Sequence, residues 1–468
     1  MKTNTDSGKI DEILTRGVVE FIDPEGSFKK KLQENPQEII IKLGVDVTRP
    51  DIHIGHAIVL RKLRQFQDLG CKVVFIIGDF TTRIGDPTAK SKVRPEIEQQ
   101  EIENNAKTFV EQVGKILLTN TKVFSWIRNS DWFTSITDLN LPDDHKVNFQ
   151  AKQNNTEINI QIEPNSFIGK AIVFEKTRMQ LNNPELINKV SRIISLNSFL
   201  WTLKHITHSR LIERDMFQER IKKGEELYMH EMIYPVLQGI DSFVLSQIYG
   251  SCDLEIGGND QTFNILMGRD VMKMNNQEPQ AVMILKMLEG LDGKEKMSKS
   301  LDNYIGIIDA PSNMYGKVMS IPDSSIKNYF ELATYTPIEE LENIKKILEA
   351  GKTNPKDLKM RLAREIVAIY HGDKEAKRAE ADFVGTFQKG GIPEGVEEGF
   401  TTKGANSTIE AVRVGLAGSN SEFRRLVGKG AVTNMETGEK ITERDFLINK
   451  NQTWKVGKRK FFKWFIKD

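Results

Sequence analysis

Residues 38–78 read EIIIKLGVDVTRPDIHIGHAIVLRKLRQFQDLGCKVVFIIG. The runs at 38–45 and 72–78 are dominated by Ile, Val, Leu and Phe, as in buried strands, and residues 57–69 between them carry apolar side chains at helical spacing. Apolar strands joined by a helical crossover form a parallel sheet that helices cover on both faces. The sequence therefore predicts an α/β fold built on a doubly wound, Rossmann-like parallel sheet of the nucleotide-binding class.

The 468 residues exceed what one hydrophobic core usually organises, so several domains are expected. Apolar runs at 243–246 and 281–288 continue the pattern of the first strands, and a β-rich stretch at 134–190 is interpreted as a surface elaboration or a dimer contact. Helical periodicity follows after Pro311, then a stretch with Gly and Pro typical of a linker. The predicted domains are a catalytic nucleotide-binding domain at 1–310 with the 134–190 insertion, a helical domain at 311–395 and a small C-terminal α+β domain at 404–468.

The composition is that of an ordinary soluble globular protein, with 39% hydrophobic residues, 28% charged residues and a formal net charge of +1. The charge is unevenly distributed, because residues 404–468 hold 13 Lys and Arg against 7 Asp and Glu, a surplus of six. A basic tail on a nearly neutral chain points to a polyanionic partner at the C-terminal end.

The two cysteines, Cys71 and Cys252, stand far apart, and neither has a second thiol at metal-ligand spacing. This pattern supports neither a disulfide framework nor a structural zinc site, so no metal ligand is assigned. Residues 1–20 hold no apolar run of signal length, and no apolar stretch of 18 residues occurs. We therefore expect a cytoplasmic protein that is neither exported nor inserted in a membrane.

The first motif, His53-Ile54-Gly55-His56, follows the first strand and opens the helix after it. Free backbone N–H groups and the helix dipole attract phosphate at such a position. The imidazoles of His53 and His56 can donate to charge that develops on the α- and β-phosphates of ATP, and Gly55 leaves room for the nucleotide. On position alone, the two histidines could instead serve only to cap the helix.

The second motif, Lys296-Met297-Ser298-Lys299-Ser300, follows the turn residues Gly290-Leu291-Asp292-Gly293. This composition predicts a mobile loop whose Lys296 and Lys299 can reach the β- and γ-phosphates, although composition by itself also allows a solvated turn. Cations that strengthen their contacts as charge builds up on the leaving group carry much of the rate in such transfers. A carboxylate that attacks the α-phosphate is already ionised at neutral pH, so no general base is needed.

The two motifs together resemble the HIGH and KMSKS signatures of the class I aminoacyl-tRNA synthetases. The chain is similar in particular to bacterial tyrosyl-tRNA synthetases over nearly its whole length apart from the insertion. The segments that carry the similarity are KLGVDVTRP at 42–50, GDF at 78–80, GDPT at 85–88, YPVLQGID at 234–241 and GGNDQ at 257–261. Lys42 departs from the better-known branch of the family, which has a tyrosine there that contacts the substrate hydroxyl, and Lys42 is left unassigned.

The resemblance implies neighbouring sites for tyrosine and ATP. Tyrosine would contact Asp86, Tyr234, Gln238, Asp241 and Gln261, with Asp86 at its α-ammonium and Asp241 at its phenol. ATP would contact His53, Gly55, His56, Asp260, Lys296, Ser298 and Lys299, and the catalytic groups would be His53, His56, Lys296 and Lys299. The spacing of Tyr234, Gln238 and Asp241 suits one helix face, although Pro235 favours a helix start or a kink there.

The resemblance also implies the reaction and the partners. A tyrosine–tRNA ligase joins tyrosine to ATP as tyrosyl-adenylate, releases pyrophosphate and transfers tyrosine to the 3′ end of its tRNA, with Mg2+ on the phosphates and usually as a homodimer. The C-terminal segment resembles a small RNA-binding domain shared with a ribosomal protein. Its candidate RNA contacts are Arg424, Arg425, Lys429, Lys458 and Arg459, whereas Phe461, Phe462 and Trp464 are expected to be core.

Three alternative functions share part of this pattern. A tryptophanyl-tRNA synthetase shares the fold and the ATP motifs, but Tyr234, Gln238 and Asp241 argue against it. A catalytically silent RNA-binding protein on the same scaffold would show eroded signatures, and both are intact. A small-molecule adenylyltransferase shares the first motif but leaves the basic tail and the helical segment without a purpose.

Overall fold

The computed structural model describes residues 7–49, 51–87, 97–133, 147–153, 156–162, 194, 196–351, 354–385, 396–457 and 460–467. The chain divides into two compact units, Met1–Ile307 with Lys327–Leu341, and Ile308–Ile326 with Glu342–Asp468. Within the described ranges, no helix is long and apolar enough to cross a membrane.

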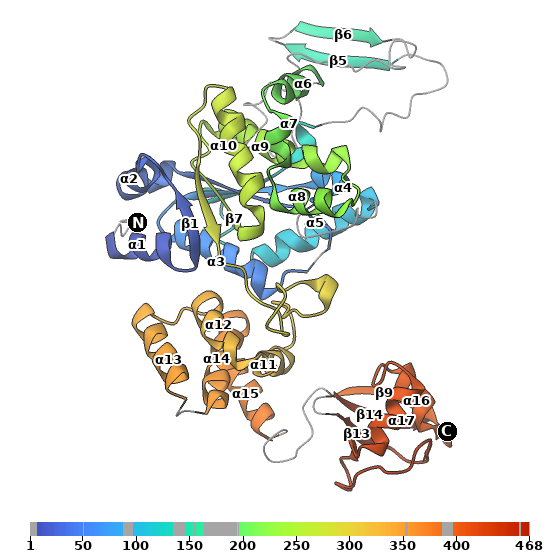
Figure 1. Ribbon diagram of the computed structural model, residues 1–468. Coiled ribbons are helices and arrows are strands. Elements are labelled where there is room, and N and C mark those ends of the chain that lie inside the picture. The colour runs from blue at the N-terminus through green and yellow to red at the C-terminus, as the bar shows by residue number, and fades with distance from the viewer. Residues whose placement is uncertain are drawn as a thin grey trace. The chain divides into compact units, whose positions relative to one another are not determined.

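A six-stranded sheet forms the centre of the first unit (Figure 1). Its order is β1-β8-β7-β2-β3-β4, in which β1 is antiparallel to β8 and the other neighbours are parallel. The strands are β1 (Val18–Ile22), β2 (Ile40–Val45), β3 (Lys72–Ile77), β4 (Phe124–Arg128), β7 (Leu254–Gly258) and β8 (Ala281–Leu285). The chain leaves β2 towards β3 and later returns on the other side through β7, so the switch point for ligand binding lies beside β2. The predicted doubly wound parallel sheet is confirmed, with one antiparallel edge strand added.

Helices cover both faces of this sheet, as β3 illustrates. The described helices of the first unit are α1 (Ser7–Thr15), α2 (Ser27–Glu34), α3 (Ile54–Asp68), α4 (Asp79–Ile84), α5 (Gln99–Val113), α6 (Leu196–Lys204), α7 (His208–Ile212), α8 (Asp215–Lys223), α9 (Met229–Tyr249), α10 (Thr262–Met274) and α12 (Ile326–Ala333). Val74 and Ile76 share a hydrophobic cluster with residues of α9 and α10, whereas Phe75 stacks on Phe109 of α5 with ring centroids 5.8 Å apart. Successive side chains of a strand point to opposite faces, so both faces of β3 are buried.

The apolar run at 243–246 lies in α9 and not in a strand. Most residues of α9 are buried, and apolar side chains occur on nearly all sides of the helix. Periodicity therefore cannot distinguish a short piece of this helix from a buried strand. The helix begins at Met229 and passes through Pro235. Tyr234, Gln238 and Asp241 accordingly lie on one continuous helix.

The range 134–190 contains an antiparallel hairpin of β5 (Val147–Gln153) and β6 (Thr156–Ile162). The alternation of polar and apolar residues in β6 is the pattern from which a strand is expected there. The second apolar run of this range, at 171–174, falls outside the described residues.

Helices form the first part of the second unit. They are α11 (Pro311–Met319), α14 (Pro355–His371) and α15 (Asp373–Phe383), while α13 (Ile338–Ala350) begins in the first unit and ends in the second. Asn354 caps α14 by accepting from the backbone N–H of Lys356, and a proline follows at the first helical position. The rings of Tyr315 and Phe383 pack with centroids 5.3 Å apart, which joins α11 to α15.

A small sheet with two helices forms the C-terminal part. Its elements are β9 (Glu397–Thr402), β10 (Ala405–Asn406), α16 (Ser407–Arg413), α17 (Asn420–Gly428), β11 (Val432–Asn434), β12 (Leu447–Ile448), β13 (Gln452–Val456) and β14 (Lys460–Lys467), with main sheet order β11-β13-β14-β9. Phe462 and Trp464 pack with Phe423 and Trp454 in one core, and Phe461 is also buried. The expectation that the C-terminal aromatic residues are core is confirmed.

Candidate active site

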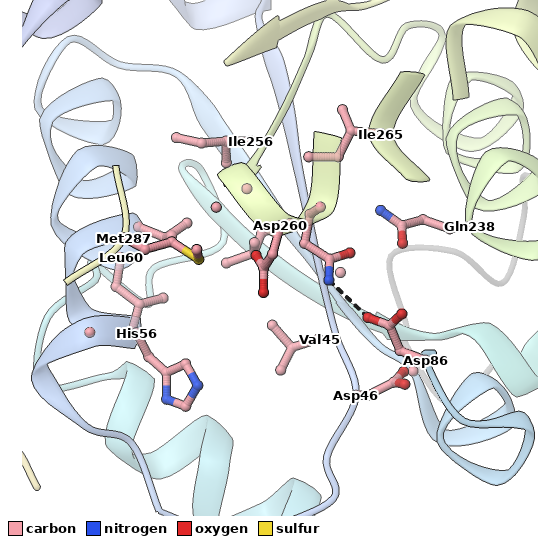
Figure 2. A pocket seen from close by; sticks show the side chains of 18 of the residues that line it. Val45, Asp46, His56, Leu60, Asp86, Gln238, Ile256, Asp260, Ile265 and Met287 are labelled. Atoms are coloured by element: carbon pink, nitrogen blue, oxygen red, sulfur yellow. Dashed lines mark hydrogen bonds between the residues drawn. The ribbon is translucent and has the colours of Figure 1, made fainter. Parts of the chain in front are cut away.

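A cavity of about 370 Å³ opens at the carboxyl ends of β2, β3 and β7. Eleven predicted residues line it: His53, Gly55, His56, Asp86, Tyr234, Gln238, Asp241, Asp260, Gln261, Lys296 and Ser298. Lys299 is the one predicted ATP or tyrosine contact outside this lining. Figure 2 shows His56 on one side of the cavity and Asp46, Asp86 and Gln238 on the other, with Asp260 between them. The two motifs and the predicted tyrosine contacts therefore face a single space.

His53 and His56 cap each other at the start of α3. The backbone N–H of His56 donates to Nδ1 of His53 at 3.4 Å, and the N–H of His53 donates to Nδ1 of His56 at 3.5 Å. The two rings stack with centroids 3.6 Å apart. A Cβ on Gly55 would lie 3.0 Å from the His53 ring and 3.5 Å from Met297, so a larger residue there would press on the His53 ring. The histidines thus both cap the helix and line the cavity.

Both imidazoles are neutral at pH 7. Burial lowers the pKa of His53 to about 2, aided by His56, Lys299 and Lys296. His56 keeps an exposed face, and desolvation of its ring within the cavity, together with the charges of Lys299 and Lys296, holds its pKa below the ordinary value. Because each Nδ1 accepts a backbone N–H, the proton of each neutral ring lies on Nε2. Each histidine can therefore donate one N–H to an oxygen atom in the cavity without carrying a charge.

Asn303 organises the loop that carries the second motif. Its Nδ2 donates to Oδ2 of Asp292 at 2.8 Å, and its Oδ1 accepts from the backbone N–H of Ser298 at 2.8 Å. A Cβ on Gly290 would lie 2.2 Å from Nδ2 of Asn303, so that position requires a glycine. The sequence analysis missed Asn303, and its place three residues after the motif is the only sequence signal for it.

The two lysines of the second motif have different partners. Nζ of Lys296 lies 2.7 Å from Oδ2 of Asp260, whereas Nζ of Lys299 donates to the carbonyl of Asp51, which precedes α3. Burial lowers the pKa of Lys299 to about 8, opposed by Asp51 and aided by Arg49. Lys299 thus ties the second motif to the segment that carries the first.

Two carboxylates and their partners lie at the side of the cavity away from His56. Asp86 accepts from Nε2 of Gln261 at 2.8 Å, and the Tyr234 hydroxyl donates to Oδ2 of Asp46 at 2.9 Å (Figure 2 shows the first of these bonds). Arg214 places its guanidinium 3.9 Å from Oδ1 of Asp86. The sequence analysis missed Asp46 and Arg214, although Asp46 directly follows β2 at the end of the strand where ligands bind.

Asp241 is buried at the floor of the cavity with two donors fixed to it. Nε1 of Trp132 donates to Oδ1 at 2.9 Å, and Nδ2 of Asn129 lies 3.4 Å from Oδ2. Burial raises the pKa of Asp241 to about 7, which Lys42 and the two hydrogen bonds oppose and Glu255 assists. The sequence analysis missed Trp132 and Asn129, which follow β4 at the same edge of the sheet as the other site residues.

Lys42 lies behind the cavity wall. Its neighbours Leu43 and Gly44 line the cavity, whereas the Lys42 side chain is fully buried and its Nζ lies 2.9 Å from Oε1 of Glu255. The positive charge of the lysine that replaces the family's tyrosine is therefore balanced by the Glu255 carboxylate inside the protein.

The predicted RNA contacts lie in and after α17. Arg424, Arg425 and Lys429 are exposed, and Arg424 is engaged by Asp445 with Nε to carboxylate distances of 3.0 and 2.8 Å. Lys458 and Arg459 fall outside the described residues.

Comparison with known proteins gives consistent results. Residues 34–388 match the family model of tRNA synthetases class I (W and Y). The tyrosine–tRNA ligase of Moorella thermoacetica is 40% identical over 456 residues, which cover 96% of this chain and 94% of that protein. The tyrosine–tRNA ligase 2 of Clostridium acetobutylicum is 38% identical over 461 residues, which cover 97% and 98%.

Among solved structures, a C-terminally truncated mitochondrial tyrosyl-tRNA synthetase of Aspergillus nidulans superposes with a TM-score of 0.54 at 18% identity, over 80% of this chain and 92% of that one. This likeness supports the fold alone. With a family model that spans most of the chain and bacterial relatives aligned over nearly all of it, the chain belongs to the class I tRNA synthetases, among the bacterial tyrosyl-tRNA synthetases.

Proposed function

We propose that this chain is a tyrosine–tRNA ligase, which forms tyrosyl-adenylate and pyrophosphate from tyrosine and ATP and then transfers tyrosine to the 3′ end of its tRNA. The observation that carries the proposal is the cavity, since both ATP motifs line it together with Tyr234, Gln238 and Asp241. The names of the bacterial relatives support the same function.

Tyrosine is proposed to bind with its phenol at Asp241 and its α-ammonium at Asp86 and Tyr234. The Asp241 carboxylate already accepts from Trp132 and Asn129, which hold its orientation, and it has lone pairs left for the phenol hydroxyl. Phenylalanine would leave this buried acceptor without that donor, a form of selection for which tyrosyl-tRNA synthetases are the known example.

The chemical step needs no proton transfer. An oxygen of the ionised tyrosine carboxylate forms a bond to the α-phosphorus, and the bond from that phosphorus to the bridging oxygen breaks as pyrophosphate leaves. His53 and His56 are proposed to donate their Nε2–H groups to the α- and β-phosphate oxygens. Neutral imidazoles suit this position, because a second positive charge would repel the lysines of the loop.

Lys296 and Lys299 are proposed to stabilise the leaving group. Lys296 is held by Asp260, and ribose hydroxyls that bind Asp260 would free its ammonium to turn to the phosphates. Lys299 is bound to a backbone carbonyl, which is a weaker partner than a phosphate, so it can exchange that contact for one made as charge develops. Ser298 and Gly55 are proposed to line the ATP site beside them.

ATP is proposed to enter as its Mg2+ complex. In the part of the chain that the structure describes, no group of three or more His, Cys, Asp and Glu is placed to hold a metal ion. The ion would therefore be held by the phosphate oxygens and reach the site as part of the substrate.

In the second step a ribose hydroxyl at the tRNA 3′ end loses its proton and bonds to the carbonyl carbon of the adenylate, the bond from that carbon to the phosphate oxygen breaks, and AMP leaves. Arg424, Arg425 and Lys429, with Lys458 and Arg459, are proposed to contact the tRNA phosphates, since the C-terminal segment carries the surplus of positive charge. This contact would position the tRNA and leave the chemistry of adenylate formation unchanged.

A homodimer in the cytoplasm is proposed as well. Leu200 and Trp201 of α6 expose 53% and 42% of their surface, and Met229 at the start of α9 exposes 68%, which suits contact with a second subunit. Light scattering is expected to give about twice the chain mass of 53.3 kDa.

The decisive experiment is amino-acid-dependent ATP–pyrophosphate exchange with tyrosine, phenylalanine and tryptophan in parallel. Exchange with tyrosine alone is expected. Exchange with tryptophan alone would instead identify a tryptophanyl-tRNA synthetase, and the absence of exchange with all three would favour a silent RNA-binding protein.

A further inference from the structure

Lys42 uses all three of its ammonium N–H groups in buried contacts. Nζ donates to the backbone carbonyl of Gln238 at 2.8 Å and to the Ser242 hydroxyl at 2.8 Å, and it lies 2.9 Å from Oε1 of Glu255. Lys42 and Glu255 are also register partners on the adjacent strands β2 and β7. The ammonium therefore links the sheet to α9 at the level of the tyrosine site.

Glu255 is occupied on both carboxylate oxygens. Besides Lys42, its Oε1 accepts from Nε2 of Gln238 at 3.0 Å, and its Oε2 accepts from Ser242 and from Nε2 of Gln280, each at 3.0 Å. The Glu255 side chain is 2% exposed. A carboxylate with four donors around it and almost no exposed surface has a single orientation.

α10 closes this network from the other side. A Cβ on Gly268 would lie 2.4 Å from Nε2 of Gln280, 2.8 Å from the Ser242 hydroxyl and 3.0 Å from Oε2 of Glu255. The network is thus packed so closely against the helix backbone that only glycine fits at this position.

The network acts on the cavity through Gln238, whose side chain faces it (Figure 2). Its Nε2 donates to Glu255, so a turn of the amide would place Oε1 against a carboxylate oxygen. Among the described residues no donor reaches Oε1 of Gln238. The amide oxygen is therefore held ready to accept from a group in the cavity.

We propose that Lys42 and Glu255 are positioning residues for tyrosine: their ion pair fixes the Gln238 amide so that its oxygen accepts from the α-ammonium of the substrate. Lys42 thus acts on the substrate through two other side chains and not by contact. The inference rests on the proposed function, since it assumes tyrosine as the occupant. If the buried ion pair served stability alone, the effect of its removal on KM for tyrosine would not depend on the presence of Gln238.

The test is a double-mutant cycle between Glu255→Gln and Gln238→Ala, read by tyrosine-dependent ATP–pyrophosphate exchange. In Glu255→Gln the new amide can present its oxygen or its nitrogen to Gln238, so the orientation is lost. KM for tyrosine should rise about tenfold, with kcat and KM for ATP within about twofold of wild type. In the Gln238→Ala background, the same change should raise KM for tyrosine less than about twofold.

Asp253→Asn is the matched control, because Asp253 is an ion-paired acid two residues before Glu255 that contacts Lys31 at 2.6 Å and not the cavity. It should leave KM for tyrosine unchanged. Ser242→Ala removes one hydroxyl from the network without removing a charge; it should fold as wild type and raise KM about threefold, again only when Gln238 is present.

Equal increases in both backgrounds, or a fall in kcat with KM for tyrosine unchanged, would overturn the positioning role. Failure of the proposed function has a separate signature, since wild type itself would then show no exchange with tyrosine.

Discussion

The two ends of the cavity are built in different ways. At the end proposed to hold the phosphates, called the phosphate end, His53, His56 and the lysine loop come from two short contiguous motifs, and Lys296 and Lys299 hold partners that a substrate can replace. At the end proposed to hold the tyrosine hydroxyl, called the phenol end, Asp241 is buried among donors from elements that are remote in sequence. A movable cation suits a charge that exists only in the transition state, whereas a fixed acceptor suits discrimination before the reaction. Changes at the first end should therefore lower kcat, and changes at the second should alter KM and specificity.

The largest effect is expected at the phosphate end. Lys299→Ala should slow adenylate formation by about 100-fold or more in single-turnover measurements, because a cation aimed at the leaving group is lost. The dissociation constant of tyrosine should stay the same. Lys294→Ala, an exposed lysine of the same loop, is the control and should have no effect. Equal losses in rate and in tyrosine binding would contradict the leaving-group role.

The next effect concerns the phenol end. Asp241→Ala should reduce the preference for tyrosine over phenylalanine, measured as a ratio of kcat/KM values, by roughly 30-fold, since a charge-assisted hydrogen bond to the hydroxyl is lost. Activity with phenylalanine should change little. An unchanged ratio would show that the hydroxyl binds elsewhere in the cavity.

The pH dependence should also separate the two ends. Because burial raises the pKa of Asp241 to about 7, its acceptor form is lost as the pH falls through 7, and KM for tyrosine should rise about tenfold from pH 8 to pH 6. A raised carboxyl pKa also means that the folded state holds the proton more tightly than the unfolded chain. This group's contribution to the free energy of unfolding should therefore fall as the pH rises from about 4 to 7. Asp241→Asn should abolish both pH dependences, and a KM profile that persists in this variant would assign the titration to another group.

The smallest effect is expected outside the cavity. Lys429→Gln should raise KM for tRNA about two- to threefold. It should also reduce the slope of the logarithm of tRNA affinity against the logarithm of salt concentration by about one, while ATP–pyrophosphate exchange with tyrosine stays unchanged. Lys403→Gln, another exposed lysine of the C-terminal part, is the control. If both variants behaved alike, the RNA contact would not lie at α17.

Local pattern was enough to predict the sheet and both motifs. The strands β2 and β3 are continuous apolar runs, and α3 between them has helical spacing, so each element is recognisable from its own residues. The same reasoning was wrong at 243–246, because a helix that is buried on nearly all sides loses the polar stripe on which recognition depends.

The residues that support the site could not be predicted in this way. Asp46 accepts from Tyr234, 188 positions away, and Trp132 donates to Asp241, 109 positions away. No local period encodes such pairs, because they exist only once the strands are ordered β7-β2-β3-β4 and their carboxyl ends meet.

The amino-acid sequence by itself determined the two motifs that are proposed to meet the phosphates, since donors at short spacing keep their chemistry in any fold that exposes them. Only the tertiary structure decided the arrangement that is proposed to recognise tyrosine. The protonation of Asp241, the pairing of Lys42 with Glu255 and the orientation of Gln238 all follow from burial and from contacts between distant segments. Electrostatic interactions depend on distance and on exclusion of water, and neither quantity is defined until the chain has folded.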